Sequence, residues 1–483
     1  MAAPATATRI VGPFNRVEGD LEVRLEVEDG RVRGAFVNSP LYRGFESMLV
    51  GRAPGDALVI VPRICGICSV SQSNAAAAAL RALSGLTMPD NGRLAHNLVS
   101  ACENLADHLS HFYLFFMPDF ARPAYADRPW FERVARRFKA LHGQATGDML
   151  PARAAFMHLM GLMAGKWPHS LSLQPGGTTR ALEQAECLQL IALLRAFRRF
   201  LEQHVFGDSL EQVAALASLA DLTAWRRNRE GDLALFLDVA EDLGLERMGR
   251  ATDVFLSYGA YEETQGQLFI PGLWQAAQHH VLAPQAIAED LSHAWLAGDA
   301  APPAQGQTIP QADKPGAYTW CKAPRYHGVV AETGALARQM VTGHPLVRDL
   351  VRLHGGSVMA RVLARLLELA LVLPRMQVWA RQLQPRAPWC HHADAPREGT
   401  AAGLVEAARG ALGHWLTVKQ GRIANYQIIA PTTWNFSPRD AQGTPGALEQ
   451  ALAHLPVSAD QDPPLLVQHV VRSFDPCMVC TVH

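Results

Sequence analysis

The chain has 483 residues, and its 44 basic and 45 acidic side chains leave a formal net charge of −1. This balance argues against nucleic acid as the main partner, because phosphate binding needs a basic face. Eight cysteines are too few for a disulfide scaffold in a chain of this length. A reducing, cytoplasmic setting is therefore the default expectation.

Targeting and membrane signals are missing from the sequence. Residues 1–9 lack the basic segment and the following apolar run that mark a secretion signal. The best candidate for a membrane span, residues 362–374, carries Arg365 and Glu368 and ends at a proline, so it predicts a core helix. We expect no direct membrane insertion, although a subunit can be exported on the signal of its partner.

The first predicted elements are β-strands. Apolar and charged residues alternate from Leu21 to Glu28, and Asp29-Gly30 then favours a tight turn into a returning strand. From about residue 68 to 410 the apolar spacing is helical, with loops at 300–316 and 385–400. The helices are predicted over 73–83, 97–116, 184–205, 234–248, 284–297, 329–384 and 401–410, and Ser209 to Gln212 predicts a helix cap.

These patterns predict a mainly α fold with small β pieces, in the α+β class. It comprises an N-terminal β-hairpin at about 10–40, a large helical-bundle body at about 68–410, and an irregular C-terminal segment at about 420–483. No linker marks a boundary, so residues 1–483 are expected to form a single integrated domain.

Two Cys-x-x-Cys pairs are the most informative motif. Cys65 and Cys68 form one pair, and Cys477 and Cys480 form the other, near the opposite end of the chain. Such spacing lets two thiolates converge on one metal. A zinc ribbon, a redox dithiol and two unrelated pairs stay open, but the wide separation argues against a ribbon. Four shared thiolates would suit zinc, nickel or iron–sulfur.

Six segments in order resemble the signature motifs of nickel–iron hydrogenase large subunits. They are NRVEG (15–19), RGFE (43–46), PRICGIC (62–68), KAPRY (322–326), NYQ through PRD (425–440) and DPCMVCTVH (475–483). The resemblance covers nearly the whole chain. It implies the fold of that family and an enzyme that cleaves dihydrogen heterolytically.

The resemblance also implies a metal centre with defined ligands. Cys65 and Cys477 would be terminal nickel ligands, while Cys68 and Cys480 would bridge nickel to an iron that carries cyanide and carbon monoxide. Glu18 would accept the proton from the terminal thiolate. Without the motif, Glu18 would be interpreted as a solvated carboxylate at a strand end.

A second group of residues is expected to shape the open side of the centre. Arg325 would point its guanidinium at this position, either as an electrostatic guide or, if desolvated, as a base. Asp119 and Asp475 would orient Arg325, and Pro324 would help form the pocket for the diatomic ligands of the iron. Alone, Arg325 would be interpreted as a surface salt bridge.

A hard cation is implied near the chain end. Glu46, His483 and a backbone carbonyl near Ile428 resemble the magnesium site of the family, and oxygen-rich sites suit Mg²⁺. A histidine at this position would otherwise be interpreted as a frayed tail.

Three departures from the family pattern favour its regulatory, dihydrogen-sensing subgroup. Gln72 stands where the family usually has histidine, Asp20 follows Gly19 in place of another histidine, and no tail follows His483. Either the sequence is the mature form, or the gene never encodes a tail. In that subgroup bulky gas-channel residues, here Ile67 and Phe115, would slow the entry of oxygen. Both could equally be plain core residues.

The expected partners follow from the need to carry electrons away from the metal centre. The chain has no further cysteine set for a relay, so an iron–sulfur small subunit is expected in an obligate heterodimer. Metal-insertion maturation proteins are expected, and a sensor histidine kinase would be the signalling partner. The alternatives are an energy-conserving uptake hydrogenase and, far behind, a catalytically dead relative like the respiratory complex I subunit. The other cysteines, Cys102, Cys187, Cys321 and Cys390, are predicted to be inert.

Overall fold

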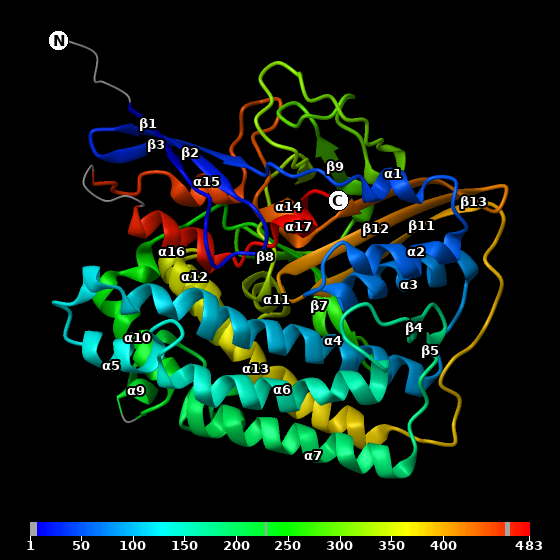
Figure 1. Ribbon diagram of the computed structural model, residues 1–483, viewed down its shortest axis with the longest axis horizontal. Coiled ribbons are helices and arrows are strands. Elements are labelled where there is room, and N and C mark those ends of the chain that lie inside the picture. The colour runs from blue at the N-terminus through cyan, green and yellow to red at the C-terminus, as the bar shows by residue number, and fades with distance from the viewer. Residues whose placement is uncertain (1–6, 228, 459–463) are drawn as a thin grey trace.

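An N-terminal three-stranded sheet opens the fold (Figure 1). The computed structural model describes residues 7–227, 229–458 and 464–483. Most of residues 1–9, which were predicted to carry no secretion signal, therefore lie outside the described residues. The antiparallel strands are β1 (Ala7–Val11), β2 (Glu22–Glu28) and β3 (Arg31–Asn38). Asp29 and Gly30 turn the chain with φ values of 50° and 71°, which confirms the predicted hairpin.

Four long helices form the body of the molecule, and α13 lies among the others (Figure 1). They are α4 (Asp90–Ser110), α6 (Gln144–Ala164), α7 (Gln184–Phe200) and α13 (Val358–Gln382). Helices α4 and α7 each pack against both α6 and α13. Nearly all apolar side chains of α13 are buried, because it faces neighbouring elements on every side.

Shorter helices connect and cover this body. They are α1 (Phe45–Leu49), α2 (Ala57–Ile60), α3 (Ser69–Ser84), α5 (Phe131–Phe138), α8 (Leu210–Ala214), α9 (Leu219–Arg226), α10 (Asp232–Leu243), α11 (Ala335–Thr342), α12 (Pro345–His354), α14 (Pro431–Asn435), α15 (Ala447–Leu452), α16 (Leu465–Ser473) and α17 (Met478–Thr481). The Ser209 hydroxyl caps α8 by accepting the Gln212 amide at 3.3 Å, as the capping pattern predicts.

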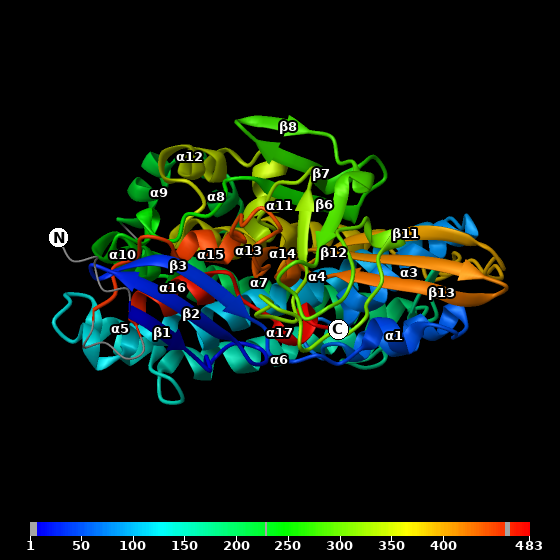
Figure 2. The ribbon, with the colours of Figure 1, turned by 90° about the horizontal axis from the view of Figure 1, so that it is seen from above.

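A second sheet packs against α3 at the other end of the molecule (Figure 2). Its strands are β11 (Gly399–Ala407), β12 (Gly410–Lys419) and β13 (Arg422–Ile429). Gly403 permits the close approach, because a Cβ there would lie 2.0 Å from the Ala75 carbonyl oxygen. The remaining strands are β4 (Leu173–Gln174), β5 (Gly177–Thr178), β6 (Phe255–Glu262), β7 (Gln267–Gln275), β8 (Gln278–His280), β9 (Ile287–Asp290) and β10 (Ala323–Tyr326).

The predicted α+β class is confirmed, but two predicted helices are wrong. Residues 401–410 form most of β11 and the start of β12, and residues 284–297 contain β9 and irregular structure. The alanine-rich sequence of 401–410 favours a helix, yet backbone pairing with β12 and contact with α3 decide its structure. The C-terminal segment is also more regular than predicted, since β13 and four helices occupy it.

The two ends of the chain meet beside the helical body. Glu18 forms a parallel bridge with Cys477, and the Met478 amide donates to the Glu18 carbonyl at 2.7 Å. Figure 1 shows α17 near the middle of the molecule, between the N-terminal sheet and β12. Among the described residues, no helix is both long and apolar enough to cross a membrane.

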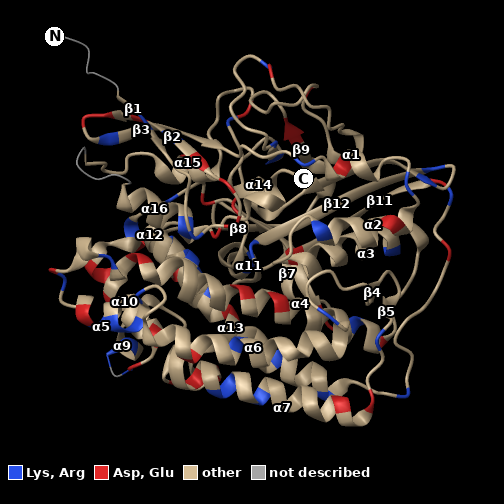
Figure 3. Cartoon of the chain, in the orientation of Figure 1, with Lys and Arg blue, Asp and Glu red and all other residues tan. Residues whose placement is uncertain are grey.

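Charged residues also lie inside the body, and Figure 3 shows them along α13. Arg361, Arg365 and Glu368 of α13 are at most 5% exposed. The Arg361 guanidinium donates to both carboxylate oxygens of Glu332, and Arg338 does the same to Glu368. Paired in this way, Arg361 and Glu368 avoid the cost of uncompensated burial, whereas Arg365 donates to the Arg361 and Ser473 carbonyls. Arg365 contacts the segment that leads to the second cysteine pair, because it donates to the Ser473 carbonyl at 2.6 Å.

Candidate metal centre

The two cysteine pairs converge, as predicted. The Sγ atoms of Cys65, Cys68, Cys477 and Cys480 all lie within 4.8 Å of one another. Cys68 and Cys480 are 2.9 Å apart, Cys477 and Cys480 are 3.0 Å apart, and Cys477 and Cys65 are 3.5 Å apart. These separations exceed a disulfide bond of about 2.05 Å, and all four cysteines are free.

The environment of the four thiols fits a bound soft metal. Each of the four residues is at most 8% exposed. Hydrogen bonds from the other three thiols lower the pKa of Cys65 well below the usual value for a thiol. Four converging sulfur donors, one of them readily ionised, match the chemistry that binds nickel or zinc.

Arg43 ties the two cysteine segments together. Its Nη2 donates to the Ile64 carbonyl at 2.6 Å and also to the Val479 carbonyl. Each carbonyl belongs to the residue immediately before a cysteine. The RGFE segment was identified as a family motif, but a role was predicted only for Glu46, so this role of Arg43 was missed.

The second pair is held by the N-terminal strand segment. Glu18 is half-buried beside Cys477, and Thr432 Oγ1 accepts the Cys477 amide at 3.1 Å. Gly19 has φ 81°, and a Cβ there would lie 3.0 Å from Val479, so only glycine allows this approach. Burial, together with the charge of Cys65, raises the pKa of Glu18, while nearby arginines oppose the rise.

Arg409, which was not predicted from the sequence, binds the segment that leads into the second cysteine pair. Its Nε donates to the Asp475 carbonyl at 2.8 Å, its Nη2 to the Asp475 carboxylate at 3.2 Å, and its Nη1 lies 3.1 Å from Asp107. Burial alone would lower the pKa of Arg409, but these two carboxylates raise it, so the guanidinium stays protonated. A lone arginine in the apolar stretch 402–416 was the signal that could have revealed it.

The structure does not bring Arg325 together with its predicted partners. Arg325 Nε donates to Asp440 at 2.9 Å, and its other nitrogens donate to Ser437 and to backbone carbonyls. Asp475 binds Arg409 instead. The prediction that Asp119 and Asp475 orient Arg325 is therefore wrong.

Asp119 is the shared acceptor of a different arginine cluster. It pairs with Arg16, with Arg122 at 2.6 Å and with Arg472 at 2.6 Å. Burial opposes ionisation of Asp119, but hydrogen bonding with His469 and these positive charges lower its pKa below the usual range. This carboxylate ties the N-terminal segment to α16, which leads to the second cysteine pair.

The residues of the expected hard-cation site do meet. His483 Nε2 lies 2.7 Å from the Ile428 carbonyl and 3.4 Å from Glu46 Oε1. Lys322 Nζ lies 3.0 Å from both oxygens of Glu46. Burial would raise the pKa of Glu46, but Lys322 and His483 lower it to about 2. Glu289 adds a carboxylate whose buried Oε1 has no partner among the described residues, so the donor set fits a hard cation.

The remaining predicted residues lie around these centres. Gln72 is buried in α3, and its Oε1 lies 2.8 Å from Nε2 of His414. Pro324 lies in β10 opposite Glu289. Ile67, within the first cysteine loop, and Phe115, in the helical turn after α4, are both half-buried. Their role in gas entry stays a prediction.

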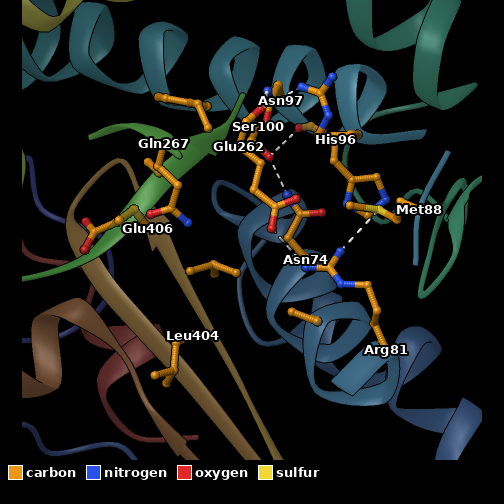
Figure 4. Close-up of a pocket in the computed structure, with 16 residues that line it drawn as sticks. Asn74, Arg81, Met88, His96, Asn97, Ser100, Glu262, Gln267, Leu404 and Glu406 are labelled. Atoms are coloured by element: carbon orange, nitrogen blue, oxygen red, sulfur yellow. Dashed lines mark hydrogen bonds and ion pairs between the residues drawn. The ribbon is translucent and has the colours of Figure 1, made fainter. Parts of the chain in front are cut away.

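A separate pocket of about 100 Å³ lies between α3, α4, β6 and β11 (Figure 4). Arg93 and Asn97 donate to the Glu262 carbonyl at 2.9 and 2.7 Å. None of the four clustered cysteines is among the described residues that line it. The pocket is therefore distinct from the metal centre.

Comparison with known proteins decides the family. The model of the nickel-dependent hydrogenase family matches residues 43–128 and 148–483. This chain belongs to the nickel-dependent hydrogenase family. It is 29% identical to the periplasmic NiFeSe hydrogenase large subunit of Desulfomicrobium baculatum, covering 100% of this chain and 96% of that protein.

Other members of the family are also similar to this chain over nearly its whole length. The chain is 27% identical to the hydrogenase-2 large chain of Escherichia coli, covering 98% of this chain and 96% of that protein. The Ni-Fe-Se hydrogenase structure from D. vulgaris Hildenborough superposes with a TM-score of 0.85 at 28% identity, covering 99% of this chain and 100% of that chain. The hydrogenase is thus a large subunit and an oxidoreductase, of the kind that pairs with a small iron–sulfur subunit.

Proposed function

We propose that this hydrogenase subunit cleaves dihydrogen to protons and electrons and serves as a hydrogen sensor that signals to a histidine kinase. The convergence of four buried cysteine thiols from opposite ends of the chain, beside Arg409 and Glu18, carries the catalytic part of the proposal. A nickel–iron centre, whose iron carries cyanide and carbon monoxide, would supply the two-electron chemistry when bound by these thiols.

The protein residues have separate tasks in this reaction. Cys477 Sγ holds a proton, and the adjacent Glu18 carboxylate accepts it, which suits a carboxyl with a raised pKa. Arg409 supplies a fixed positive charge that Asp107 and Asp475 orient. Because Arg409 stays protonated, it stabilises developing negative charge rather than acting as a base.

Magnesium is the proposed occupant of the second site. Glu46, His483 and the Ile428 carbonyl would bind it, and Lys322 with Glu289 would balance the charge around it. The site lies beside the C-terminal cysteine loop, because His483 Nδ1 also bonds the Cys480 carbonyl at 2.8 Å. Metal analysis of Glu46→Gln, which should lose the magnesium and keep the nickel, tests this assignment.

The sensing role is supported by sequence features of this chain. Gln72 occupies the usual histidine position, and Ile67 and Phe115 are bulkier than the residues expected in oxygen-sensitive members. Oxygen tolerance, slow turnover, a cytoplasmic location and the help of metal-insertion maturation proteins belong to the same proposal. The second candidate is an uptake hydrogenase, because one relative, 26% identical, is the uptake hydrogenase large subunit of Rhodobacter capsulatus.

One experiment separates the two roles. The large subunit would be purified with its small subunit, and dihydrogen-dependent dye reduction would be measured under nitrogen and in air. Binding to the candidate kinase, and kinase autophosphorylation with and without dihydrogen, would be measured on the same preparation. A sensor should turn over slowly in air and change kinase activity, whereas fast turnover without any effect on the kinase would establish the uptake role.

A further inference from the structure

Helix α3 begins immediately after the first cysteine pair but has no cap from its own sequence. Cys68 is the N-cap residue and makes no side-chain capping bond. The first amides of a helix need acceptors, and buried amides without one are costly. The acceptor here must therefore come from another element.

Glu103 of α4 is that acceptor. Its carboxylate accepts the Val70 amide, the Ser71 amide and the Ser71 hydroxyl, each at 2.9 Å. Val70 and Ser71 are the second and third residues of α3, the positions that a capping side chain normally satisfies. Burial raises the pKa of Glu103 to about 7, although these donors oppose the rise. Three of the hydrogen bonds that this buried carboxyl accepts therefore come from the start of α3.

The same carboxylate reaches a second segment that packs on the cysteine loop. Trp167 Nε1 donates to Glu103 at 3.0 Å. The adjacent Pro168 packs on the loop, with its Cγ 3.7 Å from the place of a Cβ on Gly66. His169 follows, with Nδ1 at 3.0 Å from the Pro62 carbonyl. The loop of the first cysteine pair is therefore held from both sides.

Helix α4 also reaches the second cysteine pair. Asp107 lies one turn after Glu103 on the same helix, so the two carboxylates share a face. Asp107 pairs with Arg409 at 3.1 Å, and Arg409 binds the carbonyl of Asp475, two residues before Cys477. One rigid helix thus carries an anchor for each half of the thiol cluster.

We propose that Glu103 is a positioning residue that fixes the Cys65–Cys68 pair against the Cys477–Cys480 pair through the start of α3 and through Trp167. This inference rests on the proposed metal-binding role of the four thiols. Glu103 touches none of the four cysteines in the described hydrogen bonds, so it acts through Val70, Ser71 and Trp167.

The test uses the full metal-free chain and Co²⁺ as the probe, because thiolate-to-cobalt absorbance reports sulfur ligation directly. Glu103→Gln should weaken Co²⁺ binding about tenfold, the order expected for loss of a charge-assisted hydrogen bond. It should also raise the iodoacetamide alkylation rate of Cys65 and Cys68 about tenfold, with Cys477 and Cys480 changed much less. Mass spectrometry of the labelled peptides gives the four rates separately.

Glu449→Gln is the matched control. Glu449 is also a buried carboxyl that accepts backbone amides and an aromatic hydroxyl, but its donors, Val37, Gly446 and Tyr318, belong to neither cysteine pair segment. Equal thiol reactivity in Glu103→Gln and Glu449→Gln, with Co²⁺ affinity unchanged in both, would overturn the inference.

Two milder variants guard against a simple folding failure. Ser71→Ala and Trp167→Phe each remove one donor and leave Glu103 in place, so each should raise the alkylation of the first pair about threefold. The inference would also be overturned if neither variant raised the alkylation rate of the first cysteine pair selectively. If the unsubstituted chain binds no Co²⁺ through its thiols, the proposed metal-binding function itself fails, and that outcome is distinct from an effect of Glu103.

Discussion

Glu18 and Cys477 lie in two parallel backbone segments that hydrogen-bond to each other, with the Glu18 amide donating to Pro476 and the Met478 amide donating to Glu18. This pairing fixes the backbone of Glu18 against the backbone of Cys477. In the proposed reaction, the transfer of a proton from Cys477 to Glu18 would depend on both the carboxylate and this backbone register.

Glu18→Gln is expected to stop proton exchange and to retain the metals. The amide keeps the size of the side chain but cannot accept the proton, so the rate should fall at least about 10²-fold. Isotope exchange between deuterium gas and the protons of water, followed by mass spectrometry of the gas, measures the first effect. Nickel analysis measures the second. Glu22→Gln, at the start of β2, is the control, and full exchange in Glu18→Gln would refute the assignment.

Arg409→Lys should lower turnover about 10²-fold with the metals retained, because lysine keeps the charge but loses the fork that binds Asp107 and Asp475. Arg325→Lys should instead lower the melting temperature and leave the turnover of the folded protein nearly unchanged, since its contacts are structural. Turnover per nickel and calorimetry on both variants decide the point. A larger loss of turnover in Arg325→Lys would restore the prediction made from sequence.

Ile67→Val combined with Phe115→Leu should make dihydrogen oxidation sensitive to oxygen. Smaller side chains at these half-buried positions would ease the passage of oxygen. Dye reduction with dihydrogen, measured before and after exposure to air, tests this, and each single variant serves as a control. Activity in air equal to that of the unsubstituted protein counts against a gas-channel role.

Glu449→Gln should flatten the dependence of stability on pH. Burial raises the pKa of Glu449 from 4.5 to about 7. The unfolded chain loses this proton first as the pH rises, so the free energy of unfolding falls between pH 4.5 and about 7, by up to about 1.4 kcal/mol per pH unit. Melting temperatures from pH 5 to 7.5 should fall less steeply in the variant, and identical slopes would refute the expectation.

The contrast between the cysteines and the arginines shows what could be predicted from sequence. Cysteine pairs carry their chemistry in local spacing, so the convergence of the four thiols could be predicted correctly. Arg325 sits in a matching local motif, but its true partner, Asp440, depends on how β10 meets the C-terminal segment. Arg409 lacked a recognised motif, and its segment was predicted to be a helix.

The fold shows the same limit. The β2–β3 hairpin and helices α4, α7 and α13 follow from apolar spacing and turn residues, which act over short distances. Strand β11 does not, because its alanine-rich sequence gains its structure from pairing with β12 and from contact with α3. The single integrated domain remains a prediction, and the pairing of Glu18 with Cys477 supports it.

That pairing also constrains when the thiol cluster can exist during synthesis. The ribosome delivers Glu18, Cys65 and Cys68 long before Cys477 and Cys480, and contacts so distant along a chain form late. A nascent chain therefore presents only half of the ligand set, and a metal that it captured early would be bound by two thiols rather than four. A metal that needs all four thiols can therefore be bound only after residue 480 has been synthesised.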